Sequence, residues 1–158
     1  NDKEFPYETI IFDTIDQIND WVEADVCEEL KIPAMGGADF GVDWAMSRNK
    51  TSRIFESLKM ILKKNAINLI LISHSKTASI VNKKVQLGPD LPKGLSKKLM
   101  GMLELIGYTS IDEKTKKAMI TFDVFDEIQM SSRLRPLAGQ TILFNYETFT
   151  KTIQSYTV

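Results

Sequence analysis

The sequence contains little cysteine or histidine and no long hydrophobic run. Its 158 residues include one cysteine, Cys27, and one histidine, His74. A single cysteine cannot form a disulfide within the chain, which indicates a reducing compartment and a structural role for Cys27 as a small buried side chain. No apolar stretch reaches the ~20 residues that a transmembrane helix needs. We therefore expect a cytoplasmic protein without a membrane partner.

The composition excludes several other classes of protein. Hydrophobic residues make up 43% of the chain and charged residues 26%, which is typical of a folded domain and not of a disordered or low-complexity chain. The length suits one domain, and we interpret residues 1–158 as a single one. The chain starts at Asn1 and shows no signal-peptide pattern, so we expect it to be part of a longer protein.

The net charge of −1 conceals a strong segregation of charge along the chain. Residues 1–45 carry twelve acidic side chains against two lysines, whereas residues 46–75 carry six basic side chains against one acid. Residues 76–98 again have six basic side chains against one acid. All six are lysines: Lys76, Lys83, Lys84, Lys93, Lys97 and Lys98. This segment is either a contact for a polyanion or a solvated loop.

Hydrophobic patterns in the first half predict an α/β fold. Two apolar runs, residues 7–12 and 69–73, have the length and composition of strands buried in a parallel sheet. Apolar residues at helical spacing predict one helix from about residue 15 to residue 31 and another over 43–64. Strands and helices in this order are typical of a βαβ unit, whose two strands are parallel.

The second half predicts a different pattern. Residues 75–95 contain several glycines and prolines with little periodicity, which indicates a long loop. A short helix is expected over 95–103. Residues 105–111 and 118–125 flank a charged turn and predict an antiparallel hairpin. A last strand over 141–144 and a terminal helix over 146–156 complete the chain.

Polar residues follow both apolar runs, at the point where each predicted strand ends. Asp13 closes the first run and His74 closes the second. Ligands of parallel α/β sheets bind beyond the carboxyl ends of the strands. An acid at this place can orient Mg²⁺ through water beside a triphosphate, and a histidine can donate a hydrogen bond to a γ-phosphate. The alternatives are that Asp13 caps the next helix and that His74 is a core or capping residue.

Three stretches together resemble a known family. They are Thr9-Ile10-Ile11-Phe12-Asp13-Thr14-Ile15-Asp16, then Phe40-Gly41 with Trp44, then Leu69-Ile70-Leu71-Ile72-Ser73-His74-Ser75-Lys76. In order and spacing they resemble the RecA-like nucleotide-binding proteins of bacteriophages, a P-loop ATPase group tied to single-strand annealing and recombination. The resemblance covers residues 7–76 and is looser beyond them. It implies a RecA-like core with a mostly parallel sheet and helices on both faces, followed by the hairpin and terminal elements of residues 96–158.

The resemblance also implies site residues and cofactors. Asp13 would be the Walker B acid that holds Mg²⁺ through water, and His74 would sense the γ-phosphate of ATP; both are predicted to be catalytic. Asp16 would lie beside the metal or only cap the helix. The nucleotide-binding set is completed as Asp13, Asp16, Ser73, His74 and Arg133. Arg133, in Ser131-Ser132-Arg133, is similar to a Lys-x-Arg segment of the family.

Partners follow from the same resemblance. Residues 35–44 and 75–95 correspond to the two DNA-binding loops of RecA-like proteins, so single-stranded DNA is the expected ligand in the cytoplasm of a bacterial host. The DNA-binding residues would be Phe40, Trp44, Lys76, Lys83, Lys84 and Lys93. RecA-like ATPases assemble as rings or filaments, and a homo-oligomer is expected here. Arg133 or Arg135 would then reach a neighbour's phosphates, unless both are ordinary surface residues.

One departure from the family leaves two function classes open. The phosphate-binding pattern G-x-x-x-x-G-K-[ST] is absent from the 158 residues. Without its backbone amides and lysine, the chain alone is not expected to hydrolyse ATP. Either the chain is the distal part of an ATP-dependent recombination protein whose P-loop lies before Asn1, or it is a non-catalytic module that binds DNA or protein and retains the fold.

Overall fold

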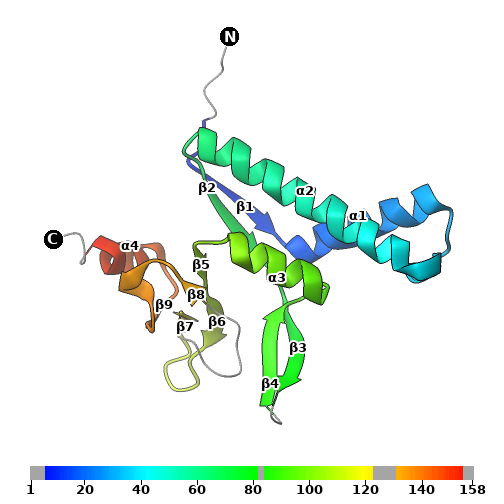
Figure 1. Cartoon of the computed structure of the whole chain (residues 1–158). Helices are drawn as coiled ribbons and strands as arrows, with labels where there is room; N and C mark the ends of the chain where they lie inside the picture. Colours follow the sequence, from blue (N-terminus) through cyan, green and yellow to red (C-terminus); the bar gives the residue numbers. More distant parts are fainter. Residues whose placement is uncertain (1–5, 82–83, 123–130, 155–158) are drawn as a thin grey trace. The chain divides into compact units, whose positions relative to one another are not determined.

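The computed structural model describes residues 6–81, 84–122 and 131–154 (Figure 1). The chain divides into two compact units. The first contains Asn1–Lys76 and Pro89–Leu99, and the second contains Thr77–Gly88 and Met100–Val158. That these units function as the one domain expected over residues 1–158 stays a prediction.

The first unit begins with the strands and helices that the sequence predicts. Its elements are β1 (Thr9–Asp13), α1 (Ile15–Leu30), the short 3₁₀ helix η1 (Asp39–Gly41), α2 (Val42–Lys64) and β2 (Asn68–Ile72). β1 and β2 pair in parallel, with Thr9 opposite Asn68 and Asp13 opposite Ile72. The predicted parallel pair is therefore confirmed, with two helices in the connection between its strands (Figure 1).

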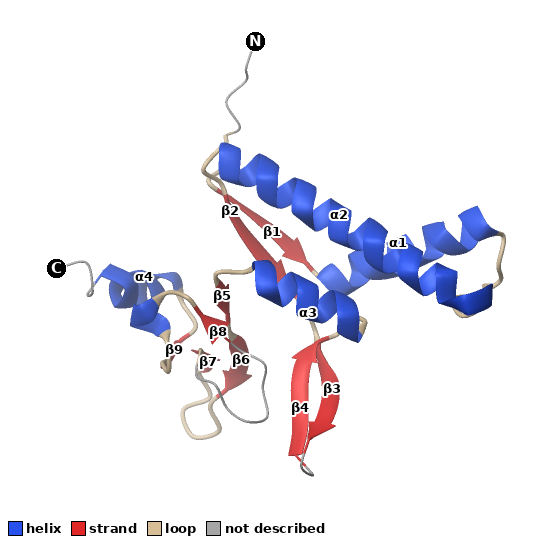
Figure 2. Cartoon of the chain, in the orientation of Figure 1, coloured by secondary structure: helices blue, strands red, loops and turns tan. Residues whose placement is uncertain are grey.

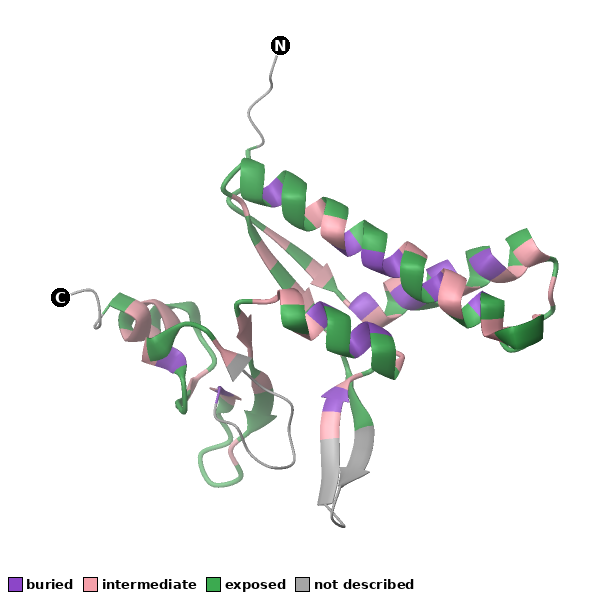
Figure 3. Ribbon diagram, viewed as in Figure 1, coloured by how far each residue is buried: buried purple, intermediate pink, exposed green. Residues whose placement is uncertain are grey.

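The described residues show a smaller parallel sheet than the resemblance implied, and its strands are less buried than their apolar runs predicted. In the described residues the parallel sheet has only two strands, and no larger parallel sheet with helices on both faces is formed. Burial alternates along β1 and β2 (Figure 3), and Ile11 and Ile70 are 57% and 46% exposed. The uninterrupted apolar runs predicted cover on both faces. α2 packs against β2, but the outward side chains of both strands lie open.

Apolar side chains of α1, of α2 and of residues 91–99 form the core of the first unit. Ile15, Val22 and Val26 of α1 are buried, as are Phe55 and Leu62 of α2. They recur at intervals of four and seven residues, which bring side chains to one face of a helix. The sequence thus sets the face of each helix that meets the other.

The predicted long loop over residues 75–95 is also wrong. Most of this segment forms β3 (Ser75–Val81) and β4 (Lys84–Pro89), which pair with each other in a two-stranded sheet. The helix α3 (Lys93–Met102) follows, as predicted to within two residues. The glycines and prolines that indicated a loop stand at the end of β4 and the start of α3. β-branched residues such as Ile80 and Val81 favour strands.

The second unit is built mainly from short antiparallel strands (Figure 2). Its elements after α3 are β5 (Leu105–Ile106), β6 (Tyr108–Ile111), β7 (Ala118–Thr121), β8 (Ser131–Ser132), the 3₁₀ helix η2 (Arg135–Leu137), β9 (Thr141–Leu143) and α4 (Tyr146–Gln154). β6 and β7 form the predicted antiparallel hairpin, with Tyr108 opposite Thr121. β9 pairs with the other edge of β7. Phe122 is buried there, and its ring centroid lies 6.3 Å from that of Phe149.

None of the helices in the described ranges combines the length and the apolar character that crossing a membrane requires.

Candidate functional site

The parallel pairing of β1 and β2 brings their polar ends to one edge of the sheet. Asp13 is the last residue of β1 and lies opposite Ile72, the last residue of β2. Ser73 and His74 follow directly. Asp13 and His74 therefore lie at the same edge on neighbouring strands, as the sequence led us to expect. This edge is the one at which α/β proteins bind ligands.

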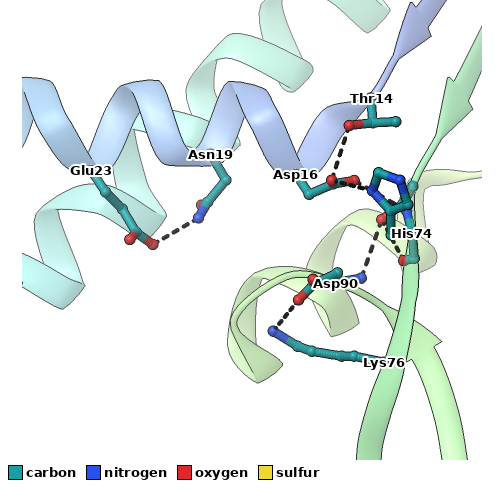
Figure 4. A network of polar contacts seen from close by, with 8 residues as sticks. Thr14, Asp16, Asn19, Glu23, His74, Lys76 and Asp90 are labelled. Carbon is teal, nitrogen blue, oxygen red and sulfur yellow. Dashed lines mark hydrogen bonds and ion pairs between the residues drawn. The ribbon is translucent and has the colours of Figure 1, made fainter.

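A hydrogen-bond network joins the start of α1 to the end of β2 (Figure 4). Asp16, in the first turn of α1, contacts the His74 imidazole, with 2.7 Å between Oδ2 and Nδ1. The His74 backbone N–H donates to Asp16 Oδ1 at 3.2 Å, and the Thr14 hydroxyl donates to Asp16 Oδ2 at 2.9 Å. Both carboxylate oxygens of Asp16 are thus engaged by protein groups, and Asp16 orients the imidazole.

The network shifts the pKa values of both partners in the direction that favours charge. Burial raises the pKa of Asp16, but the hydrogen bonds from His74 and Thr14 outweigh it and lower the pKa to about 2. The hydrogen bond to Asp16 and the negative charge of that carboxylate raise the pKa of His74, with smaller contributions from Asp90 and Asp13. The imidazole is therefore more readily protonated than an isolated histidine.

Asp13 differs from Asp16 in the environment of its carboxylate. Its side chain is exposed, and it makes no hydrogen bond or ion pair to another described residue. In the described part of the chain, no three His, Cys, Asp or Glu side chains are grouped so as to hold a metal ion. This fits Mg²⁺, which keeps several of its waters and needs only one or two protein carboxylates beside phosphate oxygens.

Ser73 and Asp90 form further hydrogen bonds at the end of β2, around the His74 carbonyl. The Ser73 hydroxyl donates to the His74 carbonyl at 3.0 Å and accepts the Asp90 N–H at 3.2 Å. The same Asp90 N–H lies 2.8 Å from the His74 carbonyl. The Asp90 carboxylate pairs with Lys76 at 2.7 Å (Figure 4). Sequence reasoning missed Asp90, because no local sequence pattern shows that the chain returns at Asp90 to Ser73 and His74.

The other predicted site residues are distributed over the chain. Arg133 belongs to the second unit, where it donates to the Gly101 carbonyl at 3.0 Å and lies 3.5 Å from Glu104. Arg135 begins η2 and is exposed. Lys93 is exposed at the start of α3. Lys83 lies outside the described residues, and of Lys84 only the backbone, in β4, is described. The roles assigned to all these residues stay predictions.

The start of α2, which contains Trp44 and directly follows Phe40 in η1, lies at the opposite end of α1 from the strand ends (Figure 1). The 16 residues of α1 correspond to roughly 24 Å at 1.5 Å per residue. The Phe40 side chain is fully exposed and Trp44 is 38% exposed. The structure therefore does not bring this aromatic pair to the Asp13 and His74 edge within the first unit.

A buried carboxylate that sequence reasoning missed holds the loop in which Phe40 lies. Asp43, in the first turn of α2, is completely buried. It accepts backbone N–H groups from Trp44 at 2.8 Å, from Gly36 and from Ala38. Burial raises its pKa, but these hydrogen bonds outweigh that effect and lower it. An acid in the first turn of a helix after a glycine-rich loop is a signal that could have identified Asp43.

Comparison with known proteins identifies a family. The sequence profile of a family described as an AAA domain matches residues 1–134. No curated protein and no solved structure matches the chain.

Proposed function

Because this chain belongs to an AAA domain family of P-loop NTPases, we propose that the edge formed by β1 and β2 is the metal and γ-phosphate side of an ATP site. The proposed activity is that of an ATP-dependent, RecA-like phage protein for DNA recombination or annealing. The parallel register carries the proposal, because it sets Asp13 and His74 side by side at the edge where such sheets bind ligands.

Each residue of this edge has a distinct task in the proposal. Asp13 binds Mg²⁺ through a water molecule, since its carboxylate is exposed and uncommitted. A carboxylate can only accept, so the Asp16 contact places a proton on His74 Nδ1. With its raised pKa, His74 is readily protonated at Nε2 as well and then donates a hydrogen bond to a phosphate oxygen. Bound Mg²⁺ supplies neutralisation of the phosphate charge.

The alternative to an ATP site rests on the absence of the phosphate-binding pattern from the 158 residues. A fold of this kind without that loop is compatible with a module that binds DNA or protein without turnover. Binding of a nucleotide at Asp13 and His74 distinguishes the two proposals, because a module without turnover needs no nucleotide there.

The single histidine allows a direct test by proton NMR. His74 gives the only histidine Hε1 resonance of the chain. Paramagnetic Mn²⁺ with ATP should broaden this resonance, and excess Mg²⁺ with ATP should restore it. Asp13→Asn should abolish the broadening while the folded spectrum is kept. Asp39→Asn, which removes an exposed carboxylate elsewhere in the first unit, is the matched control and should behave like the wild type.

Two results would overturn the ATP site. One is a His74 resonance that Mn²⁺ with ATP leaves sharp at millimolar concentration. The other is equal broadening in wild type and Asp13→Asn, which would indicate metal bound to the Asp16 and His74 pair itself.

Single-stranded DNA is the proposed macromolecular ligand. Its supports are the full exposure of Phe40 and the exposed lysines Lys76 and Lys93. A base stacked on an aromatic ring is worth about 1–3 kcal/mol with little dependence on salt. Titration with oligothymidine at several salt concentrations should show weaker binding for Phe40→Ala at an unchanged salt slope. Unchanged affinity of a folded Phe40→Ala variant would remove this loop from the DNA site.

A further inference from the structure

Lys50 marks one side of the hairpin formed by α1 and α2. Its ammonium group pairs with Asp25 Oδ2 at 2.7 Å and with Glu29. Lys50 belongs to α2 and both acids belong to α1, so these ion pairs cross between the helices. The residues at helical spacing from Lys50 and from Asp25 therefore lie on this same side of the hairpin.

On this side, large apolar residues are exposed on both helices. Trp21 lies four residues before Asp25 on α1 and is 66% exposed. Ile54 and Ile61 follow Lys50 by four and eleven residues on α2, and they are 39% and 58% exposed. A tryptophan and two isoleucines in one neighbourhood, rimmed by charge, are typical of a protein interface. We call this set the hairpin face.

The two helices of the hairpin face carry opposite charge. α1 has six acidic side chains and no basic one. α2 has six basic side chains and two acids, of which Asp43 is buried. On the hairpin face Glu28 is exposed beside Trp21, and Arg53 and Lys64 are exposed beside the isoleucines. None of these three forms an ion pair with another residue of the described part of the chain.

We propose that the hairpin face is the interface of a two-fold symmetric dimer of this chain. A two-fold axis over the hairpin lays acidic α1 on basic α2 of the second copy and repeats that contact a second time. The face is thereby complementary to itself in charge, and Trp21 is buried against the apolar residues of the other copy. This complementarity selects a second copy as the occupant rather than a nucleic acid, which acidic α1 would repel. The dimer does not depend on the proposed ATP site.

Sedimentation of the 158-residue chain tests the dimer. The wild type should pass from monomer to dimer as its concentration rises, without ATP, and higher salt should weaken the dimer by screening. Trp21→Ala should raise the dissociation constant by about tenfold or more, as is typical of a central tryptophan. Tyr146→Ala, which removes an aromatic ring that is 84% exposed in the second unit, is the control and should leave the constant unchanged.

Charge reversal gives the sharper test, because two defective variants should restore each other. Glu28→Lys makes the unpaired charges of the face basic on both helices, and Arg53→Glu with Lys64→Glu makes them acidic on both. Each variant alone should stay monomeric, whereas an equimolar mixture should form heterodimers. Lys114→Glu with Lys117→Glu, which makes the same charge change in the turn between β6 and β7, should dimerise like the wild type.

Several results would overturn the proposal. They are a monomeric wild type at all concentrations, a mixture that associates no better than its components, and assembly into species larger than a dimer. Loss of oligonucleotide binding in Arg53→Glu with Lys64→Glu, at unchanged sedimentation, would identify the basic stripe as a nucleic-acid surface and would also overturn it.

Discussion

The two ends of α1 each depend on a buried or half-buried aspartate, but the two carboxylates are held by different kinds of donor. Asp16, at the start of α1, is held by the side chains of Thr14 and His74 together with the His74 backbone N–H. Asp43 organises the loop beyond the other end of α1 through backbone N–H groups alone. A peptide N–H does not titrate, whereas an imidazole does. We therefore expect the loop to stay fixed over the ordinary pH range and the strand end to respond to pH.

The largest effect on stability is expected when Asp43 is removed from the loop beyond the second end of α1. Asp43→Ala leaves the N–H groups of Gly36, Ala38 and Trp44 without their buried acceptor, and unsatisfied buried donors are costly. Differential scanning calorimetry should show a melting temperature lower by about 5 °C or more. The exposed Asp39 provides the control, since Asp39→Ala should change the melting temperature by no more than about 1 °C. Equal melting of both variants would show that Asp43 does not hold the loop.

A smaller, pH-dependent effect is expected at the other end of α1. The pKa of Asp16 falls from its ordinary 3.8 to about 2 on folding, so its contribution to stability is present above pH 3.8 and is lost as the pH falls toward 2. The pKa of His74 rises on folding from its ordinary 6.5, so its contribution is present below pH 6.5 and is lost as the pH rises through the raised value.

Asp16→Asn should remove both pH dependences together. The melting temperature of the wild type minus that of Asp16→Asn should be largest between about pH 4 and 6.5, on the order of 3 °C, because the His74 side chain is mostly exposed and solvent screens the pair. Melting curves at half-unit pH steps would measure the difference. A difference that does not vary with pH would contradict the assigned ion pair.

The smallest effect on stability is expected at the tip of the loop. Phe40 has a φ of 57°, in the left-handed region that glycine adopts without strain. Phe40→Gly should leave the melting temperature unchanged or raise it by about 1–2 °C, while it removes the exposed ring. A clearly lower melting temperature would mean that the ring packs against the protein in solution.

The sequence predicted the positions of helices and strands better than it predicted what packs against them. The periodicity of residues 15–31 and 43–64 located both helices, because the buried face of a helix leaves a repeating pattern. The end of each apolar run located Asp13 and His74. The number of strands in the sheet could not be predicted, since an uninterrupted apolar strand has the same composition with one face covered or two.

Long-range partners were the other gap. The contact between Asp16 and His74 spans 58 residues, and no local pattern encodes it. Asp43 was missed although its donors lie within seven residues of it, because they are backbone N–H groups that no side-chain pattern identifies. The hairpin over residues 75–89 was missed because the glycines and prolines of this segment were interpreted as part of a long loop. They mark instead the end of β4 and the start of α3.

The return of the chain at Asp90 closes the β3 and β4 arm at its base. The Asp90 N–H meets the His74 carbonyl at 2.8 Å, so the polypeptide re-enters the first unit at the place where it left. This closure ties residues 74 and 90 together, so the end of β2 is held in place by the chain that returns to it as well as by the chain that leads to it.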